Sequence, residues 1–79
     1  MKIRFFGRLR DSLGEEMEVA VAQGETVADL RARLAALHPD AATELLGTRV
    51  RAFVADAMVG EDFRLAGEPV EFLPPVSGG

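Results

Sequence analysis

The sequence has no cysteine and only one histidine, His38, and these absences exclude several kinds of site. Without cysteine there is no disulfide framework, no thiolate nucleophile and no cysteine ligand for a metal. A lone histidine at a helix end is usually structural, and Ser77 has no base near it in the sequence. No glycine has the spacing of a phosphate loop, and the acidic residues in 15–18 and 61–62 are typical of solvated charge. We therefore expect no catalytic residues, no metal site and no bound cofactor.

Long apolar runs and clustered basic residues are also lacking. No segment approaches the roughly 20 apolar residues that cross a bilayer, and the first residues lack the apolar core of a signal peptide. We therefore expect a cytoplasmic protein with no membrane partner. The net charge is −4, and the eight arginines and the single lysine, Lys2, form no basic run, so nucleic acid is not an expected partner. This acidic balance favours a protein partner whose rim is basic.

What the chain does have is enough apolar sequence for one small core. Hydrophobic residues make up 48% of the 79 residues, which argues against a disordered segment. A chain of this length buries only about 60% of its unfolded surface, so its stability should be modest. We expect one domain at residues 1–73 and a projecting tail at residues 74–79.

Alternating apolar and polar side chains predict the strands. Ile3 and Phe5 fall on one face of residues 3–6, and Phe6 falls on the other. Residues 16–21 alternate in the same way, so these two segments are expected to pair. Five strands are expected, at residues 3–6, 16–21, 49–54, 57–59 and 70–73. Side chains expected to point into the core are Ile3, Phe5, Met17, Val19, Val21, Val50, Ala52, Val54, Val70 and Phe72.

One long amphipathic helix is predicted to begin after Thr26, which can form a capping box with Asp29, and to end before Pro39. Its apolar stripe comprises Val27, Leu30, Leu34 and Leu37, and Asp29, Arg31 and Arg33 are expected to face water. A short helix is expected at residues 8–13, closed by Gly14. A second is expected after Asp40 as its cap, with Ala42, Leu45 and Leu46 packed inward and Gly47 at its end.

A single long helix can cover only one face of the sheet, so the chain predicts a two-layer α+β fold. The first and last strands are the most aromatic, which suits parallel neighbours at the centre of the sheet. This is the arrangement of a ubiquitin-like β-grasp, a mixed sheet of about five strands with one main helix packed on one face. Its other face would expose Phe6, Phe53 and Leu73 together, and an apolar patch ringed by charge usually marks a protein interface.

The ending of the chain predicts a tail with a reactive tip. Two prolines stiffen the exit from the last strand, and two glycines carry no Cβ that would clash with a narrow channel. Six extended residues reach on the order of 20 Å, which is enough to enter the active site of another protein. We interpret the terminal carboxylate as the reactive group. The residues of the tail are Pro74, Pro75, Val76, Ser77, Gly78 and Gly79.

Phe5-Phe6, Arg10 and above all residues 72–79 resemble the small-subunit family of molybdopterin synthase, and the resemblance covers the whole chain in length and element order. Gly67-Glu68-Pro69-Val70 departs from the more usual Gly-Asp-Glu-Val. The resemblance implies a sulfur carrier. Its terminal glycine, here Gly79, is adenylated with ATP by a ubiquitin-activating-like adenylyltransferase and converted to a thiocarboxylate with sulfur from a donor protein.

The same resemblance implies that this tail then enters the large subunit of molybdopterin synthase. There the sulfur passes to cyclic pyranopterin monophosphate, and all catalytic groups belong to the partner proteins. Residues 74–78, Gly78 among them, would thread the channel. The residues that would contact partners are Phe6, Arg10, Phe53 and Leu73.

Three other functions stay open from the sequence. A thiamine-pathway sulfur carrier shares the fold and the Gly-Gly ending, although such chains are usually shorter and lack the double proline. A ubiquitin-like modifier would join Gly79 to lysines of target proteins, and its isopeptide conjugates would appear in cell extract. A non-covalent β-grasp binding module would need no tail, so removal of Gly79 would leave its partner binding unchanged.

Overall fold

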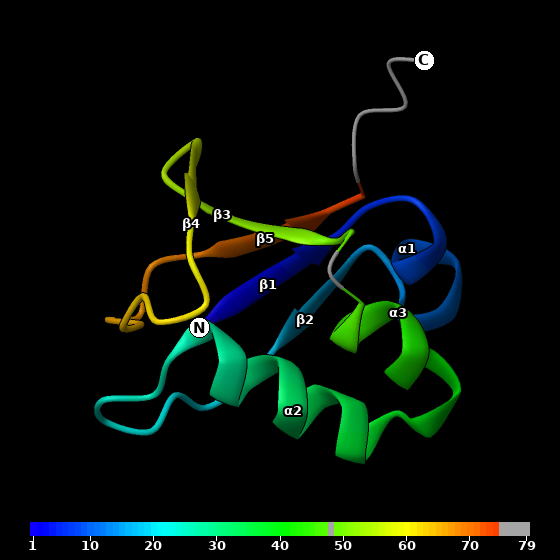
Figure 1. The fold of residues 1–79 in the computed structure, drawn as a ribbon, viewed down its shortest axis with the longest axis horizontal. Helices are drawn as coiled ribbons and strands as arrows, with labels where there is room; N and C mark the ends of the chain where they lie inside the picture. The colour runs from blue at the N-terminus through cyan, green and yellow to red at the C-terminus, as the bar shows by residue number, and fades with distance from the viewer. Residues whose placement is uncertain (48, 75–79) are drawn as a thin grey trace.

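The computed structural model describes residues 1–47 and 49–74, which form a two-layer α+β fold (Figure 1). A five-stranded sheet makes one layer, and helices α2 and α3 lie on the same side of it. The elements in chain order are β1 (Lys2–Phe5), α1 (Arg8–Leu13), β2 (Glu16–Glu18), α2 (Val27–Leu37), the 3-10 helix η1 (Pro39–Ala41), α3 (Ala42–Leu46), β3 (Arg51–Val54), β4 (Ala57–Val59) and β5 (Val70–Leu73).

The sheet has the strand order β2-β1-β5-β3-β4. The first and last strands are central and parallel, with Ile3 opposite Val70 and Phe5 opposite Phe72, as the sequence predicts. The other neighbouring strands are antiparallel. Strands β2 and β3 are shorter than predicted, because β2 ends at Glu18 and β3 begins only at Arg51. This topology makes β5, the strand that leads into the tail, a central strand held on both sides.

Strand alternation predicts the core correctly. The rings of Phe5 and Phe72 stack with their centroids 6.1 Å apart, and Leu30 and Leu34 of α2 are buried in the same core. The inward residues of β2 and the segment after it are half-buried at its margin. Completely or almost completely buried residues predicted from the strands are Ile3, Phe5, Val50, Ala52, Val54, Val70 and Phe72.

Helix α2 begins with the predicted capping box. The Thr26 hydroxyl accepts a hydrogen bond from the backbone N–H of Asp29 at 3.2 Å, and the Asp29 carboxylate accepts one from the N–H of Thr26 at 3.0 Å. The pKa of Asp29 lies below its ordinary value, chiefly because its carboxylate accepts a hydrogen bond from the Thr26 backbone. The hydrogen bond with the Thr26 side chain and the charge of Arg64 lower this pKa further. The negative charge of this carboxylate therefore interacts favourably with the positive end of the helix dipole at the N-terminus of α2.

The prediction that Arg31 faces water is wrong, because its side chain is only 6% exposed. Its guanidinium donates hydrogen bonds to the backbone carbonyls of Leu45, at 2.9 Å, and of Val50. It also forms an ion pair with Glu61 at 2.9 Å and lies 5.3 Å from the centre of the Phe72 ring. The chain between α3 and β3 crosses this side of α2, and its carbonyls need donors once buried, so the arginine is drawn inward.

Four smaller expectations about the helices are also wrong. Arg33 is half-buried and pairs with Glu25 at 2.9 Å rather than facing water. Leu37 and Leu46 are 63% and 58% exposed, because each is the last residue of its helix and lies at the margin of the core. Asp40 lies within η1 and does not cap α3, because the chain enters α3 directly from η1.

Candidate functional site

The face of the sheet opposite α2 carries the predicted apolar patch. Phe6, Phe53 and Leu73 are half-buried there, as strand alternation predicts. Met58 of β4 lies directly opposite Phe53 and is 62% exposed, so it extends the patch. Met58 was not among the predicted patch residues, although its register in the hairpin after β3 could have placed it on this face. We call Phe6, Phe53, Met58 and Leu73 the outer-face patch.

Charged side chains lie beside and between the residues of the outer-face patch, because Glu71 is opposite Phe53 and Arg51 is opposite Leu73 in the strand register. Arg4 lies 3.6 Å from Glu71 and its guanidinium stands 5.7 Å from the centre of the Phe6 ring. Lys2 lies 3.7 Å from Glu16 on the neighbouring strand. Exposed ion pairs of this kind contribute little to stability, but they leave the patch bordered by fixed charge, as in many protein interfaces.

The tail leaves β5 at Pro74, which lies against Gly7, the residue that precedes α1. Gly7 has a φ of 66°, and a Cβ built on it would lie only 3.0 Å from Cγ of Pro74. A glycine is therefore required where the chain passes the base of the tail. The remaining tail predictions, for Pro75, Val76, Ser77, Gly78 and Gly79, lie outside the described residues, and the proposed division into residues 1–73 and 74–79 stays a prediction.

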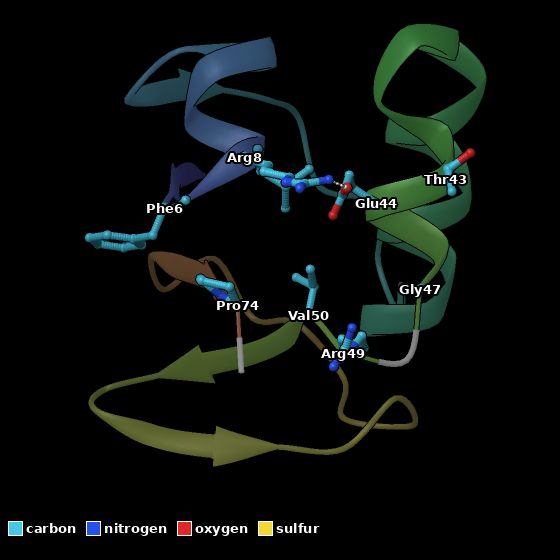
Figure 2. A pocket seen from close by; sticks show the side chains of 10 residues that line it. Phe6, Arg8, Thr43, Glu44, Gly47, Arg49, Val50 and Pro74 are labelled. Carbon is cyan, nitrogen blue, oxygen red and sulfur yellow. Dashed lines mark ion pairs between the residues drawn. The ribbon is translucent and has the colours of Figure 1, made fainter. Parts of the chain in front are cut away.

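A pocket of about 660 Å³ lies beside Pro74, between α1, α3 and the start of β3 (Figure 2). Arg8 extends from α1 across it toward Glu44 of α3, and the two side chains lie 3.5 Å apart. We call it the tail-root pocket. Its lining residues are Phe6, Gly7, Arg8, Leu9, Thr43, Glu44, Gly47, Arg49, Val50 and Pro74.

The tail-root pocket was not predicted from the sequence, because its walls come from segments about forty residues apart and no local pattern joins them. Phe6 lines the pocket and also belongs to the outer-face patch, so the two surfaces are continuous. Arg10, the fourth residue expected to contact partners, is exposed on α1, outside the sheet and the lining of the pocket. The partner contacts of these residues stay predictions.

In residues 1–47 and 49–74, no three His, Cys, Asp or Glu side chains are grouped so that they could hold a metal ion. None of the helices in those ranges has the length and apolar character needed to span a membrane.

Comparison with known proteins gives a family and a full-length relative. A family model described as the ThiS family matches residues 3–79. The molybdopterin synthase sulfur carrier subunit of Escherichia coli (strain K12) is 34% identical over 80 residues, which cover 100% of this chain and 99% of that protein. The resemblance found in the sequence is therefore confirmed.

Solved structures confirm the fold. A Pyrococcus furiosus protein assigned as molybdopterin converting factor, subunit 1, matches with a TM-score of 0.82 and 29% identity over 95% of each chain. The crystal structure of SAMP1 from Haloferax volcanii, a small archaeal modifier protein, matches with a TM-score of 0.82 and 22% identity. That match covers 99% of this chain and 97% of the other. An identity this low shows the fold alone, an α+β fold of the ubiquitin-like β-grasp kind.

Proposed function

Because this chain belongs to the ThiS family, we propose that it is the sulfur carrier subunit of a molybdopterin synthase. The observation that carries the proposal is the full-length relative from Escherichia coli, whose name is molybdopterin synthase sulfur carrier subunit. The tail sequence from Pro74 to Gly79 supports the same function, because it supplies a carboxylate on a narrow glycine end.

The chemistry proposed for Gly79 has three steps. Its carboxylate attacks the α-phosphate of ATP in the adenylyltransferase, so that an acyl-adenylate forms and pyrophosphate leaves. Hydrosulfide supplied by the donor, with its sulfur at the oxidation level of sulfide, then attacks the acyl carbon and displaces AMP, which yields the thiocarboxylate without any change of oxidation state. Adenylation is needed because a carboxylate is a poor acyl donor and AMP is a good leaving group.

In the last step the thiocarboxylate sulfur is transferred to cyclic pyranopterin monophosphate inside the large subunit. The carrier contributes position rather than catalytic groups. Its outer-face patch offers an apolar docking surface at the point where β5 leads into Pro74, so a partner that binds the patch also holds the base of the tail. Binding energy from this surface would orient the reactive end in the active site.

The proposal is tested by sulfur transfer in a reconstituted system with the large subunit, the adenylyltransferase, ATP, a sulfur donor and cyclic pyranopterin monophosphate. We expect deletion of Gly79, and Gly78→Phe, to abolish molybdopterin formation. Every residue of the described core precedes Pro74, so the melting temperature of both variants should stay close to that of the original chain. Normal molybdopterin formation by both variants would refute the proposal.

The alternative of a thiamine-pathway carrier is separated from this one by a genetic test. The name of the 34% identical relative favours molybdopterin synthase. A strain that lacks this protein should lose active molybdenum enzymes and still grow without thiamine. The modifier alternative predicts isopeptide conjugates of Gly79 with lysines of other proteins, which a mass-spectrometric search of cell extract would detect.

A further inference from the structure

The tail-root pocket combines an apolar floor with a charged rim. Leu9 and Val50 are buried beneath it, whereas Arg8 and Arg49 are exposed at its edge. In Figure 2, Arg8 reaches across from α1, and Arg49 lies on the side of the start of β3. An apolar depression with charge at its rim can accept one apolar side chain of a partner and fix its orientation.

The net charge at the rim of the pocket has the opposite sign to the net charge of the whole chain. Arg8 and Arg49 contribute two positive charges and Glu44 one negative charge, so the rim is positive although the chain carries −4. The ion pair between Arg8 and Glu44 is weak, because the Arg8 side chain is 85% exposed and the charges are 3.5 Å apart. Arg8 can therefore exchange Glu44 for a carboxylate of a partner at little cost.

The wall that carries Arg49 and Val50 is held in place from inside the fold. The buried guanidinium of Arg31 donates to the carbonyls of Leu45 and Val50, and to that of Gly47 at 3.4 Å. These contacts fix both ends of the connection between α3 and β3. Wall residues that such contacts hold in place lose less conformational entropy when a partner binds.

We propose that the tail-root pocket is a second docking point for the large subunit, which adjoins the outer-face patch at Phe6. This inference rests on the proposed function. The large subunit would place an apolar side chain over Leu9 and Val50, and an adjacent acidic side chain of the same segment would pair with Arg8 and Arg49.

The position of Pro74, as well as the charge of the rim, favours this partner. Pro74 lines the pocket and is also the residue through which the chain continues to its carboxyl end. An enzyme whose channel receives that end must surround Pro74, so its rim lies over the pocket. The net negative charge of this chain favours a partner whose contact surface is basic overall. Over the pocket, however, we expect the partner surface to be acidic, because charges interact mainly within the screening length of about 8 Å and the nearest charges here are Arg8 and Arg49.

The test compares Arg49→Glu with Arg64→Glu, which makes the same change of charge at an exposed position near Gly24 rather than at the pocket. Affinity for the large subunit is measured by calorimetry at low and high salt. We expect Arg49→Glu to weaken binding about tenfold at low salt and much less at high salt, whereas Arg64→Glu stays within about twofold of the original chain.

A second variant tests the pocket without changing its charge. Thr43 is exposed on α3 at the edge of the pocket, with its side chain directed outward in Figure 2, so Thr43→Trp should hinder entry at that edge and leave the fold intact, which the melting temperature checks. We expect this variant to bind the large subunit about tenfold more weakly, because the apolar side chain of the partner no longer fits the pocket.

The inference is overturned if Arg49→Glu and Thr43→Trp both bind the large subunit as the original chain does. Failure of the proposed function looks different, because molybdopterin formation would then survive deletion of Gly79. If the original chain does not bind the large subunit at all, the inference and the proposed function are both wrong.

Discussion

Arg31 shows how far a single side chain can depart from the pattern of its helix. Its position beside Leu30 and before Ala32 gives no sign of burial, and the helical pattern places it on the polar face. The guanidinium is nevertheless buried, because it supplies donors to the carbonyls of Leu45 and Val50 in a segment distant in the sequence. Such a contact depends on tertiary structure, so the sequence alone could not predict it.

We predict that Arg31→Met destabilises the fold by about 3 kcal/mol, since the change keeps most of the apolar volume but leaves buried carbonyls without donors. Urea unfolding measures the loss. Arg64→Met is the control, because Arg64 is exposed and donates one hydrogen bond, to Gly24, so its cost should stay below about 1 kcal/mol. Equal losses for the two variants would show that the buried contacts of Arg31 contribute no net stability.

The capping box of α2 is the helix feature that the sequence predicts best. Thr26 and Asp29 are three residues apart and interact through their own backbone, so no distant segment is needed. The strand alternation is local in the same sense, which is why the inward and outward residues of β1, β3 and β5 were correct. Exposure of Leu37 and Leu46 depends instead on where the helices end against the sheet.

We predict that Thr26→Ala lowers the free energy of unfolding by about 1 kcal/mol near neutral pH, because one N-terminal N–H of α2 loses its acceptor. Chemical denaturation measures this value. A conservative Thr26→Ser keeps the hydroxyl and should recover most of the loss. A Thr26→Ala variant as stable as the original chain would contradict a stabilising role for the cap.

Because the pKa of Asp29 is lowered, the contribution of this cap to the stability of the fold depends on pH. Because the folded-state pKa lies below the ordinary value of 3.8, the ionised carboxylate stabilises the fold above that value, and the contribution is lost as the pH falls through the folded-state pKa. The stability difference between the original chain and Asp29→Asn should therefore shrink from about pH 6 to about pH 3 in paired denaturation experiments. A difference that grows on acidification would contradict this assignment.

Strands β3 and β5 place Phe53 and Leu73 of the outer-face patch on the side away from the core, so substitutions there should affect partner binding more than folding. We expect Phe53→Asp and Leu73→Asp to weaken binding to the large subunit at least about tenfold, because each puts a charge into an apolar contact. Their melting temperatures should fall far less than that of Ala52→Asp, whose side chain points into the core. Losses of stability as large as that of the control would mean that these side chains are mainly structural.

The molecule as a whole has two surfaces that meet at the exit of β5, the outer-face patch and the tail-root pocket, and both include Phe6. The sequence predicted the fold and the patch, since both follow from alternation, one long helix and the pairing of the first and last strands. The pocket could not be predicted, because it forms only where α1, α3 and β3 converge. The tail prediction rests on residues 74–79 of the sequence and on the relatives.

The central claim is that the carboxylate of Gly79 carries sulfur, and intact-protein mass spectrometry tests it most directly. The chain is incubated with the adenylyltransferase, ATP and a sulfur donor, with a matched reaction that lacks ATP. The account predicts a mass increase equal to the exchange of one oxygen for sulfur, located at Gly79 by fragmentation and absent without ATP. An unchanged mass in a reaction that fully converts a known sulfur carrier would contradict the account.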